Sequence, residues 1–407
     1  MATGDAAYIK KINRSLIISK IIEHGMISRA DLSKITKLTR ATISVQVADL
    51  IEEELLVESQ QEHNNVGRKP IMLSLNRKAG YALGIDLDYR HITFTLSDLI
   101  GYPVYSDTIE LQNSNYDEIV QILKKQIRLY QGQYSTNNFG IVGIVIGIHG
   151  IVGKDEIIHF VPQHKWREKD LKGDLEKEFN IGIQIENNAN LCSFAEKVFK
   201  HHHSENLLSI SMYSGIGLGV LLNGDALKGF HGYAGEMGHM IIVPDGKPCN
   251  CGNLGCWELY ASEDSFFKQL AQQLKKQNLT YDDVKKLIAT QDPTTTKQLE
   301  QFIKYVSIGL NNIINLLNPQ TLVLNSELLK LYPDAENQIK SLLTSSVSDY
   351  KELLISELGK NACVMGACSL AIKNFLEVPE LSLNIENDVF EQNIESHVSE
   401  ISFNHIS

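Results

Sequence analysis

The chain of 407 residues lacks any run of eighteen or more apolar residues, and its first twenty residues contain no apolar core of the kind found in signal peptides. These absences predict a protein that neither crosses a membrane nor is exported. Cysteine is scarce as well: there are six, and Cys192, Cys363 and Cys368 show no spacing typical of a disulfide framework. We therefore expect a cytoplasmic protein in a reducing compartment, and the pattern leaves a disulfide among these three open.

The chain also lacks the excess of positive charge that a protein coating nucleic acid would carry, because its net charge is −11. The charge is unevenly distributed. Residues 1–80 have twelve Lys and Arg against nine Asp and Glu, and residues 1–48 have eight against three. A basic N-terminal part on an acidic body fits a small DNA-binding module joined to a larger sensor, and the length allows two or three domains.

Three helices are predicted at the N-terminus. Apolar residues recur at helical spacing over residues 8–23, Ser28 can cap a second helix, and Thr39 can cap a third. Helix, short turn, helix is the outline of a helix-turn-helix, whose second member lies in the major groove of double-stranded DNA. Four residues on the outward positions of that helix are the predicted DNA contacts: Arg40, Thr42, Ser44 and Gln46.

A hairpin is predicted directly after the third helix, because residues 56–60 and 71–75 alternate like two strands. Its tip contains Arg68 and Lys69, which we expect to contact a minor groove or the DNA backbone. The alternative interpretation is a three-helix protein-interaction module with a solvated basic face. Charge, helix order and hairpin together favour a winged helix-turn-helix that binds an operator.

Strands alternate with helices over the rest of the chain. Strands are predicted at 81–87, 92–97 and 103–109, a helix near 116–130 and a very apolar strand at 141–148. The order begins again with strands at 207–212 and 217–222, ahead of helices from residue 262 onward. This repetition predicts an α/β protein of two similar lobes, with ligands bound at strand ends and between the lobes.

The chain ends in an acidic segment. Residues 377–407 contain seven acidic residues and no Lys or Arg. The composition is compatible with either a peripheral acidic helix or a partly disordered segment.

Cys249, Cys251 and Cys256 fall within eight residues, and His239 stands just upstream. Three thiolates and an imidazole form a closed tetrahedral set, which is typical of structural zinc. A reduced, cysteine-lined turn is the alternative. Glu236 and Glu258 flank the ligands, so a loop held by a metal would present two carboxylates in fixed positions, which suits the binding of hydroxyl groups.

The stretch from Gly235 to His239, Gly-Glu-Met-Gly-His, together with the cysteine stretch from Cys249 to Glu258, resembles the signature of the ROK family of repressors, open reading frames and kinases. The resemblance implies a two-lobed ribonuclease-H-like fold of the actin and sugar-kinase type over about residues 80–375. With the predicted head, the chain is similar to the xylose-repressor-like branch of that family. The implied domains are a winged helix-turn-helix at 1–78, a sugar-binding domain at 79–376 with its zinc loop at 239–256, and an acidic extension at 377–407.

The resemblance also implies roles for single residues. The zinc ligands would be His239, Cys249, Cys251 and Cys256, and the sugar contacts would be Asn187, Asn188, Glu236, His239 and Glu258. His149 would lie at a strand end facing the sugar, where it either touches the sugar or is a turn histidine without a function. Trp166 is either a stacking surface for the sugar or, more commonly for tryptophan, a core residue.

The chain departs from the kinases of the family at three places. Asn188 stands where they have the aspartate that acts as general base, and an amide cannot accept that proton. Residues 86–90 replace the family's Asp-x-Gly-Gly-Thr phosphate loop, and residues 325–326 replace a glycine pair near the nucleotide. Residues 214–219 still look like a phosphate-binding hairpin, which alone is weak evidence. We therefore predict no catalytic residues and no phosphoryl transfer.

The sequence thus predicts a kinase-inactive transcriptional repressor of carbohydrate-utilisation genes, such as those of xylose metabolism. Its partners would be double-stranded operator DNA and a small sugar or sugar phosphate, and it would act as a homodimer or homotetramer. Two alternatives remain open at this point. One is a sugar kinase with a fused DNA-binding head, and the other is a repressor released by a protein partner.

Overall fold

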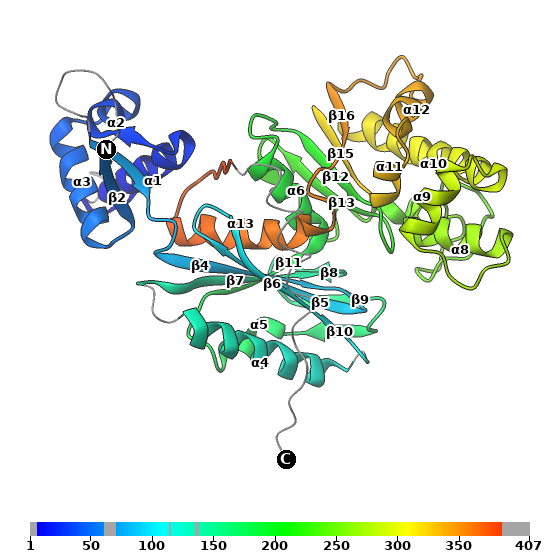
Figure 1. Ribbon diagram of the computed structural model, residues 1–407, viewed down its shortest axis with the longest axis horizontal. Coiled ribbons are helices and arrows are strands. Elements are labelled where there is room, and N and C mark those ends of the chain that lie inside the picture. Colours follow the sequence, from blue (N-terminus) through cyan, green and yellow to red (C-terminus); the bar gives the residue numbers. More distant parts are fainter. Residues whose placement is uncertain (1–5, 61–70, 114, 135–137, 385–407) are drawn as a thin grey trace.

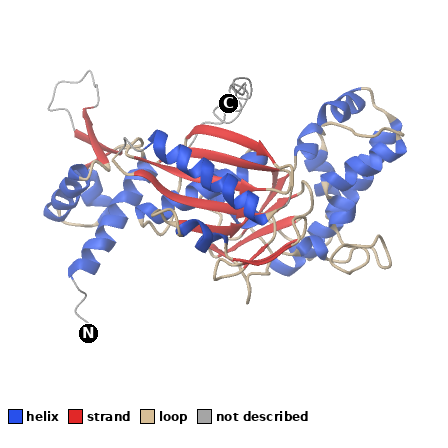
Figure 2. Cartoon of the chain, turned by 90° about the horizontal axis from the view of Figure 1, so that it is seen from below, coloured by secondary structure: helices blue, strands red, loops and turns tan. Residues whose placement is uncertain are grey.

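The computed structural model describes residues 6–60, 71–113, 115–134 and 138–384, which form a small N-terminal head and two α/β lobes (Figure 1). Strands form the middle of each lobe and helices cover them, as the second view also shows (Figure 2). Among the described helices, none combines the length and the hydropathy that crossing a membrane requires.

The head is a three-helix unit with a small sheet. Its elements are α1 (Ala6–His24), β1 (Ile27–Ser28), α2 (Arg29–Thr36), α3 (Arg40–Glu52), β2 (Leu56–Gln60) and β3 (Ile71–Leu75). The Ser28 hydroxyl accepts from the Asp31 backbone N–H, and the Thr39 hydroxyl accepts from that of Thr42, each at 3.1 Å. Both predicted helix starts are confirmed, because these hydroxyls satisfy backbone donors that a helix leaves free.

The predicted hairpin is confirmed as the antiparallel pair β2 and β3, with Leu56 opposite Leu75. The two-residue strand β1, which the sequence did not indicate, pairs with β3 and completes a three-stranded sheet. The hairpin tip with Arg68 and Lys69 lies outside the described residues. Its predicted DNA contacts therefore stay predictions.

The first lobe contains a five-stranded sheet of order β11-β7-β4-β5-β6. Its main elements are β4 (Gly80–Leu87), β5 (His91–Asp98), β6 (Pro103–Glu110), α4 (Tyr116–Tyr134), β7 (Gly140–Ile148), α5 (Leu171–Glu176) and β11 (Ile183–Asn187). A small sheet of β8 (Ile151–Val152), β9 (Ile158–Val161) and β10 (Trp166–Lys169) extends it. Helices α4 and α5 cover one face of the large sheet, and α13 (Ala362–Leu376) lies along the other (Figure 1).

The second lobe repeats this arrangement with the order β14-β13-β12-β15-β16. Its strands are β12 (Leu207–Ser211), β13 (Gly217–Leu222), β14 (Asp225–Ala226), β15 (Thr321–Asn325) and β16 (Glu352–Ile355). In both sheets the first three strands are antiparallel and the fourth and fifth are added in parallel. The predicted duplication is thereby confirmed.

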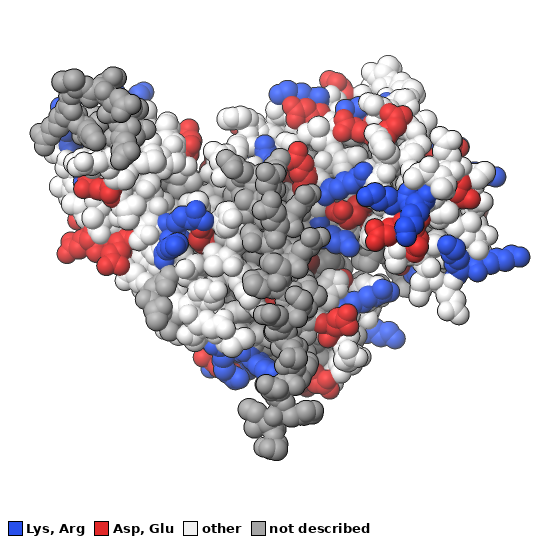
Figure 3. Space-filling view, in the orientation of Figure 1, with Lys and Arg blue, Asp and Glu red and all other residues white. Residues whose placement is uncertain are grey.

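Helices fill the space beside the second sheet. They are α6 (Asn188–Phe199), α7 (Glu258–Ala261), α8 (Glu263–Gln273), α9 (Tyr281–Ala289), α10 (Pro293–Leu317), α11 (Glu327–Leu331) and α12 (Ala335–Leu342), with short 3₁₀ turns η1 (Met237–His239) and η2 (Gly359–Asn361). On the face seen in Figure 3, basic and acidic side chains are interspersed over this lobe. The excess of acidic residues is therefore not gathered in one block of that face.

The head and the first lobe share one hydrophobic core. Ile17 and Ile21 of α1 belong to the same cluster of buried residues as Leu376 at the end of α13. Polar contacts reinforce this junction, because Lys11 Nζ lies 2.8 Å from Glu377 Oε1 and the Ser15 hydroxyl donates to the Glu377 carbonyl at 2.8 Å. The linker is also held, since Arg77 Nε donates to the buried Asp98 carboxylate at 2.5 Å.

The described part of the acidic extension, residues 377–384, forms no helix and is held against the body. Val378, Leu381 and Leu383 are each 5 % exposed or less, and the Leu383 backbone N–H donates to the Val198 carbonyl at 2.9 Å. The acidic composition concealed this docking because the three apolar residues that carry it are spread among polar ones.

Candidate functional site

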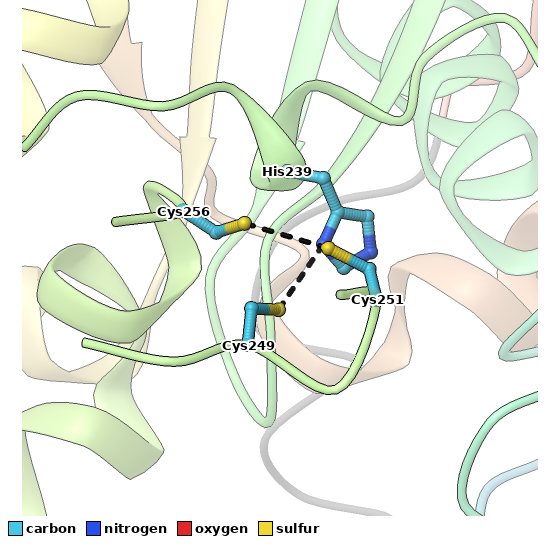
Figure 4. Close-up of side chains that lie close together, drawn as sticks. All are labelled: His239, Cys249, Cys251 and Cys256. Atoms are coloured by element: carbon cyan, nitrogen blue, oxygen red, sulfur yellow. Dashed lines mark hydrogen bonds between the residues drawn. The ribbon is translucent and has the colours of Figure 1, made fainter. Parts of the chain in front are cut away.

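His239 and the three cysteines come together as one cluster, with their ligand atoms within 4.8 Å of one another (Figure 4). Cys249 Sγ lies 3.6 Å from His239 Nδ1, and Cys251 Sγ lies 3.6 Å from Cys256 Sγ. The turn between Cys249 and Cys256 is tight, since the Cys249 N–H donates to the Asn253 carbonyl and Gly252 has a φ of 99°. A side chain would strain Gly252 in that conformation. The four residues could hold a metal ion.

Burial acts against the thiolate form of two of these cysteines. Cys256 is fully buried and Cys249 is 9 % exposed, and this burial raises the pKa of both thiols. Two protonated thiols beside an imidazole make only weak interactions with one another. A divalent cation would reverse this, because it stabilises the thiolate form and replaces the protons.

Glu236, His239 and Glu258, three of the predicted sugar contacts, lie side by side. His239 Nδ1 is 3.4 Å from Glu258 Oε1, and its Nε2 is 3.8 Å from Glu236 Oε2. One ring nitrogen thus faces the cysteines, and the other faces away from them toward Glu236. A single imidazole can therefore serve a metal through Nδ1 and a hydroxyl group through Nε2.

The other two predicted sugar contacts stand at the start of α6. The Asn187 side chain caps this helix, with its oxygen accepting from the Ala189 N–H at 2.8 Å, and its nitrogen donates to the Gly150 carbonyl at 2.8 Å. Asn188 is the first residue of the helix. The structure therefore gives Asn187 a clear role in positioning the loop at residues 149–150, and its sugar contact stays a prediction.

The two groups of predicted sugar contacts, one at the start of α6 and one around Glu236, both lie against strand β13. A Cβ on Gly219 would lie 2.1 Å from the Ala189 carbonyl oxygen, so only glycine lets α6 approach the strand this closely. A Cβ on Gly235 would lie 2.3 Å from the carbonyl oxygen of Leu218, which belongs to the same strand. The start of α6 and the segment that carries Glu236 are both packed tightly against β13.

A segment of the second lobe, residues 227–235, crosses to the first lobe. Lys228 Nζ forms an ion pair with Glu186 Oε2 at 2.5 Å, and Gly232 packs against the Val152 carbonyl. The Tyr233 ring stacks on His159 with centroids 6.2 Å apart. Because Glu236 follows this crossing directly, its carboxylate is brought to the side of the first lobe that carries Asn187.

Polar side chains at the strand ends of the second lobe bond to one another. The Tyr213 hydroxyl donates to Asn325 Oδ1 at 2.7 Å, and Asn325 Nδ2 donates to the Gly359 carbonyl at 3.0 Å. The buried Glu263 carboxylate accepts from the Ser326 hydroxyl at 2.6 Å and from Tyr281. These bonds connect the segment after β12 with the end of β15, α8, α9 and η2.

The predicted DNA contacts on α3 are not all on its surface. Arg40 and Ser44 are exposed, and Thr42 is half-buried beside its partner Thr39. Gln46 does not take the outward position predicted for it, because this residue is only 5 % exposed. The exposed turn carries Val45 instead, at 58 %, which sequence reasoning missed because an apolar residue on a helix is usually assigned to the core.

Two further residues noted in the sequence have clear positions. Trp166 is 4 % exposed and stacks on His164 in the first lobe, which confirms the core interpretation. His149 follows the end of β7, and its Nε2 lies 2.8 Å from Oδ1 of Asp86 on β4. Its neighbourhood could be recognised only once the strands were placed side by side, since 63 residues separate the two in sequence.

Comparison with known proteins gives consistent matches. The ROK family profile matches residues 82–374. The chain is 38 % identical to the xylose repressor of Bacillus subtilis, covering 93 % of this chain and 99 % of that protein. It is similar over 94 % of its length to the structure of a ROK family transcriptional regulator described as a homolog of the Escherichia coli MLC protein, with 27 % identity and a TM-score of 0.75. A ROK family glucokinase from Streptomyces griseus, solved with glucose and AMPPNP, shares the fold of 72 % of the chain with a TM-score of 0.64 and 21 % identity.

Proposed function

The chain belongs to the ROK family, and on that premise we propose that it is a DNA-binding transcriptional repressor whose hold on its operator is controlled by a small sugar. One observation carries the proposal. A helix-turn-helix head with a β-hairpin is packed onto a two-lobed sugar-kinase fold, and Asn188 stands where the family resemblance implies the general base. The relatives that the chain matches over more than nine-tenths of its length are named as repressors and a transcriptional regulator.

The sugar would bind between the start of α6 and the segment that carries Glu236. Carboxylates accept hydrogen bonds from neighbouring hydroxyl groups, and Glu236 and Glu258 supply two of them on either side of His239. Asn187 and Asn188 add amide groups. Because several of the named relatives are xylose repressors, D-xylose is the first sugar to test.

Zinc would hold the carboxylates in place. Zinc bonds of about 2.3 Å to sulfur and about 2.0 Å to nitrogen separate two ligands of a tetrahedron by roughly 3.5–3.8 Å. The cluster has two such separations of 3.6 Å without rearrangement. Since all four ligands come from the protein, the ion would leave no position for an activated water, and its contribution would be to fix the loop.

Phosphoryl transfer is not expected from this chain. The Asn188 amide cannot take the proton of an attacking hydroxyl, and loss of a positioned base lowers rates by about 10² to 10⁴. Asn325 and Ser326 stand where the family resemblance implies a glycine pair near the nucleotide, and they are bonded to Tyr213 and Glu263. Both features support a site that binds a sugar without modifying it.

The head would act as one of at least two in an oligomer. A single helix-turn-helix makes few base contacts, and such proteins gain affinity by placing two heads on half-sites about 34 Å apart. Rotating the lobes would change the separation of the heads. The sugar can drive such a change only if it binds one arrangement more tightly than the other.

The experiment that tests this proposal first identifies the operator and then measures binding to it. The full chain is used to select duplexes from a random-sequence DNA pool, and affinity for the selected duplex is measured with and without D-xylose, D-glucose or N-acetylglucosamine. We expect a selected sequence with two half-sites, and a loss of affinity of at least about tenfold with one sugar. Failure to enrich any sequence, or DNA affinity that no sugar changes, would count against the proposal.

A coupled assay for ADP release separates this proposal from a sugar kinase with a fused head. The same sugars are supplied with ATP and Mg²⁺, and the full chain is compared with the assay mixture without protein. We expect no sugar-dependent ADP release. Turnover with the sugar that changes DNA affinity would favour the kinase instead.

A further inference from the structure

The four members of the metal-binding cluster differ in how far they are exposed to solvent. Cys256 is fully buried and Cys249 is 9 % exposed, whereas Cys251 is exposed and His239 is half-buried. Among cysteines of the same chemical state, exposure decides which sulfur atom a dissolved oxidant reaches. The cluster is therefore open to small reagents at Cys251, and the protein shields its other two sulfur atoms.

Cys251 has one sulfur partner at close range. Its Sγ lies 3.6 Å from that of Cys256, and the two side chains point toward each other (Figure 4). The third sulfur atom has different neighbours, because Cys249 Sγ lies 3.2 Å from Glu258 Oε1 and 3.6 Å from His239 Nδ1. A disulfide bond is about 2.05 Å long, so the sulfur atoms of Cys251 and Cys256 need to approach by about 1.5 Å.

The turn provides room for this approach on the side of Cys251. A Cβ on the next residue, Gly252, would meet nothing within 4 Å, so the chain beside Cys251 borders on open space. Cys256 is held more firmly, since the backbone N–H groups of Gly255 and Trp257 each donate to a backbone carbonyl at 2.8 Å. Closing the pair thus needs a movement of the exposed cysteine and leaves the backbone around Cys256 in place.

We propose that Cys251 and Cys256 form a redox switch in the metal site, in which hydrogen peroxide converts their two thiolates into a disulfide and the ion is released. Bound to a divalent cation, both sulfur atoms are thiolates. The Cys251 thiolate attacks one oxygen atom of the peroxide, the O–O bond breaks, and a sulfenic acid and a hydroxide ion form. The Cys256 thiolate then attacks the Cys251 sulfur, and the S–O bond breaks with loss of a second hydroxide ion. Each sulfur atom gives up one electron, and the peroxide accepts both.

The disulfide removes two of the four ligands. Only His239 and Cys249 would then remain, and zinc sites in proteins have at least three protein ligands. A disulfide sulfur carries no negative charge, so it does not replace a thiolate as a ligand. Zinc should therefore leave the oxidised loop. A small thiol such as dithiothreitol reverses the reaction, because thiol–disulfide exchange restores both cysteines for a new ion.

The effect of this switch on the sugar rests on the proposed function. Glu258 stands two residues after Cys256, and its Oε1 lies 3.4 Å from His239 Nδ1, the ring nitrogen that faces the cysteines. Without the ion, this imidazole and the carboxylates of Glu236 and Glu258 beside it are no longer fixed. Peroxide would thus lower the affinity for sugar and keep the repressor on its operator while sugar is present. Control by sugar would resume once the two thiols are restored.

The first test needs neither sugar nor DNA. The full chain, loaded with zinc, is treated with a small excess of hydrogen peroxide, and the released zinc is followed with a chromogenic chelator. We expect one zinc ion to leave for every two thiols that are lost. The remaining thiols are then alkylated in urea and mapped by mass spectrometry. Cys251 and Cys256 should be unlabelled, and the other four of the six cysteines should be labelled.

Zinc that stays bound under this treatment would overturn the inference. A map in which Cys251 or Cys256 remains labelled would do so as well, because the disulfide would then be absent or formed by another pair. A full chain that takes up no zinc would overturn the inference together with the proposed metal site.

Cys251→His offers a nitrogen ligand in place of the exposed sulfur and cannot form the disulfide. It should keep zinc at peroxide concentrations that empty the wild type, and zinc loss equal to that of the wild type would count against Cys251 as the point of attack. Cys192→Ala is the matched control, because this cysteine is buried on α6 outside the cluster, and it should release zinc as the wild type does. The thiol map of the wild type decides the inference whether or not the imidazole binds the ion.

The second test measures binding of D-xylose, D-glucose and N-acetylglucosamine by calorimetry, before and after peroxide treatment of the zinc-loaded chain. For the sugar that the reduced chain binds, we expect affinity to fall at least about tenfold on oxidation and to recover after dithiothreitol and zinc are added. Undiminished affinity in an oxidised, zinc-free chain would overturn the switch and leave the proposed function standing. A reduced chain that binds none of the three sugars would instead count against the proposed function, and the zinc and thiol measurements would still decide whether the disulfide forms.

Discussion

Glu196 lies on α6, and its carboxyl group is buried where this helix meets Ser356 of the second lobe. Glu196 is 1 % exposed. The Ser356 hydroxyl donates to its Oε1, and its Oε2 lacks a hydrogen-bond partner within the described residues. Burial raises the pKa of Glu196 to about 7, and the bond from Ser356 offsets this only in part. An ionised Glu196 is therefore a cost to the folded state.

The pH dependence follows from this raised pKa. The folded chain keeps the Glu196 proton up to about pH 7, whereas the unfolded chain releases it near pH 4.5. The stability that the protonated Glu196 contributes to the folded chain is fully present below about pH 4.5 and is lost as the pH rises to 7. At pH 8 we expect Glu196→Gln to raise the free energy of unfolding by about 1–3 kcal/mol, and the gain to vanish near pH 4.5.

Urea unfolding at both pH values checks this prediction. Glu205→Gln serves as the control, since this residue is exposed, and it should change stability by no more than about 0.5 kcal/mol. An equal gain for Glu196→Gln at both pH values would show that the charge is not the cause.

Some residues of the site can be predicted from sequence and others cannot. The four metal-binding candidates lie close together in sequence, and their chemical types already define a ligand set, so the sequence identifies the cluster correctly. Glu196 and Ser356 are 160 residues apart, and His149 and Asp86 are 63 apart. Such pairs carry no local signal, because their contact exists only once two strands or two lobes are assembled.

At the scale of elements, α3 shows where local patterns fail. Its start at Thr39 is predicted correctly, because a cap is a local bond between residues three apart. Its outward face is predicted only in part, since the head core takes up Gln46 and leaves Val45 exposed. The side of a short helix that faces a core depends on how the neighbouring helices cross it, and spacing alone does not determine that.

The two sides of α3 should respond differently to substitution. Arg40→Ala removes an exposed cation and is expected to cost about 1–3 kcal/mol of binding free energy with the selected duplex, without loss of stability. Gln46→Ala removes a buried side chain and is expected to cost about 1–3 kcal/mol of stability. Fluorescence anisotropy and thermal unfolding of both variants distinguish the two effects. A Gln46→Ala protein of normal stability that fails to bind DNA would return Gln46 to the DNA contacts.

Changes in the cysteine loop should lower the affinity for sugar and leave DNA binding by the head unchanged. Cys251 is exposed, so Cys251→Ala removes a ligand with little loss of packing. We expect the variant to lose its metal and at least about tenfold in sugar affinity, because Glu236 and Glu258 are no longer held. Its affinity for the selected duplex should stay within about twofold of the wild type.

Metal content by atomic spectroscopy and sugar binding by calorimetry check this prediction. Asn253→Ala is the control, since it lies in the same turn and contributes its backbone carbonyl to Cys249, which the substitution keeps. Undiminished sugar binding in a metal-free Cys251→Ala protein would contradict the account of the loop.

At the scale of the whole molecule, α13 connects the proposed sugar site with the head. Its first turn carries Cys363, which lies beside Asp86, and its last residue leads to Glu377, which contacts α1. A helix is stiff along its axis, so a movement of the lobes against one another would reach α1 through these contacts. This provides a physical path for coupling, which needs two arrangements that the sugar distinguishes.

Weakening the contact between α1 and Glu377 should reduce the coupling and spare both binding reactions. In the double variant Lys11→Met, Ser15→Ala we expect the effect of sugar on DNA affinity to fall by about 0.5–2 kcal/mol. Sugar affinity and DNA affinity, each measured alone, should stay close to those of the wild type. Lys10→Met, which removes a lysine paired with Asp49 inside the head, is the control. Full coupling in the double variant would exclude this path.

The common core of head and body has a consequence for protein engineering. Because Ile17 and Ile21 of the head are packed in one cluster with Leu376 and the residues that follow it, residues 6–75 do not form a self-contained reading unit. A chimera that joins this head to the body of another regulator would leave one side of α1 without its counterpart. Chimeras should therefore carry over α13 and residues 377–384 with the head, so that two distant stretches of the gene are exchanged as one module.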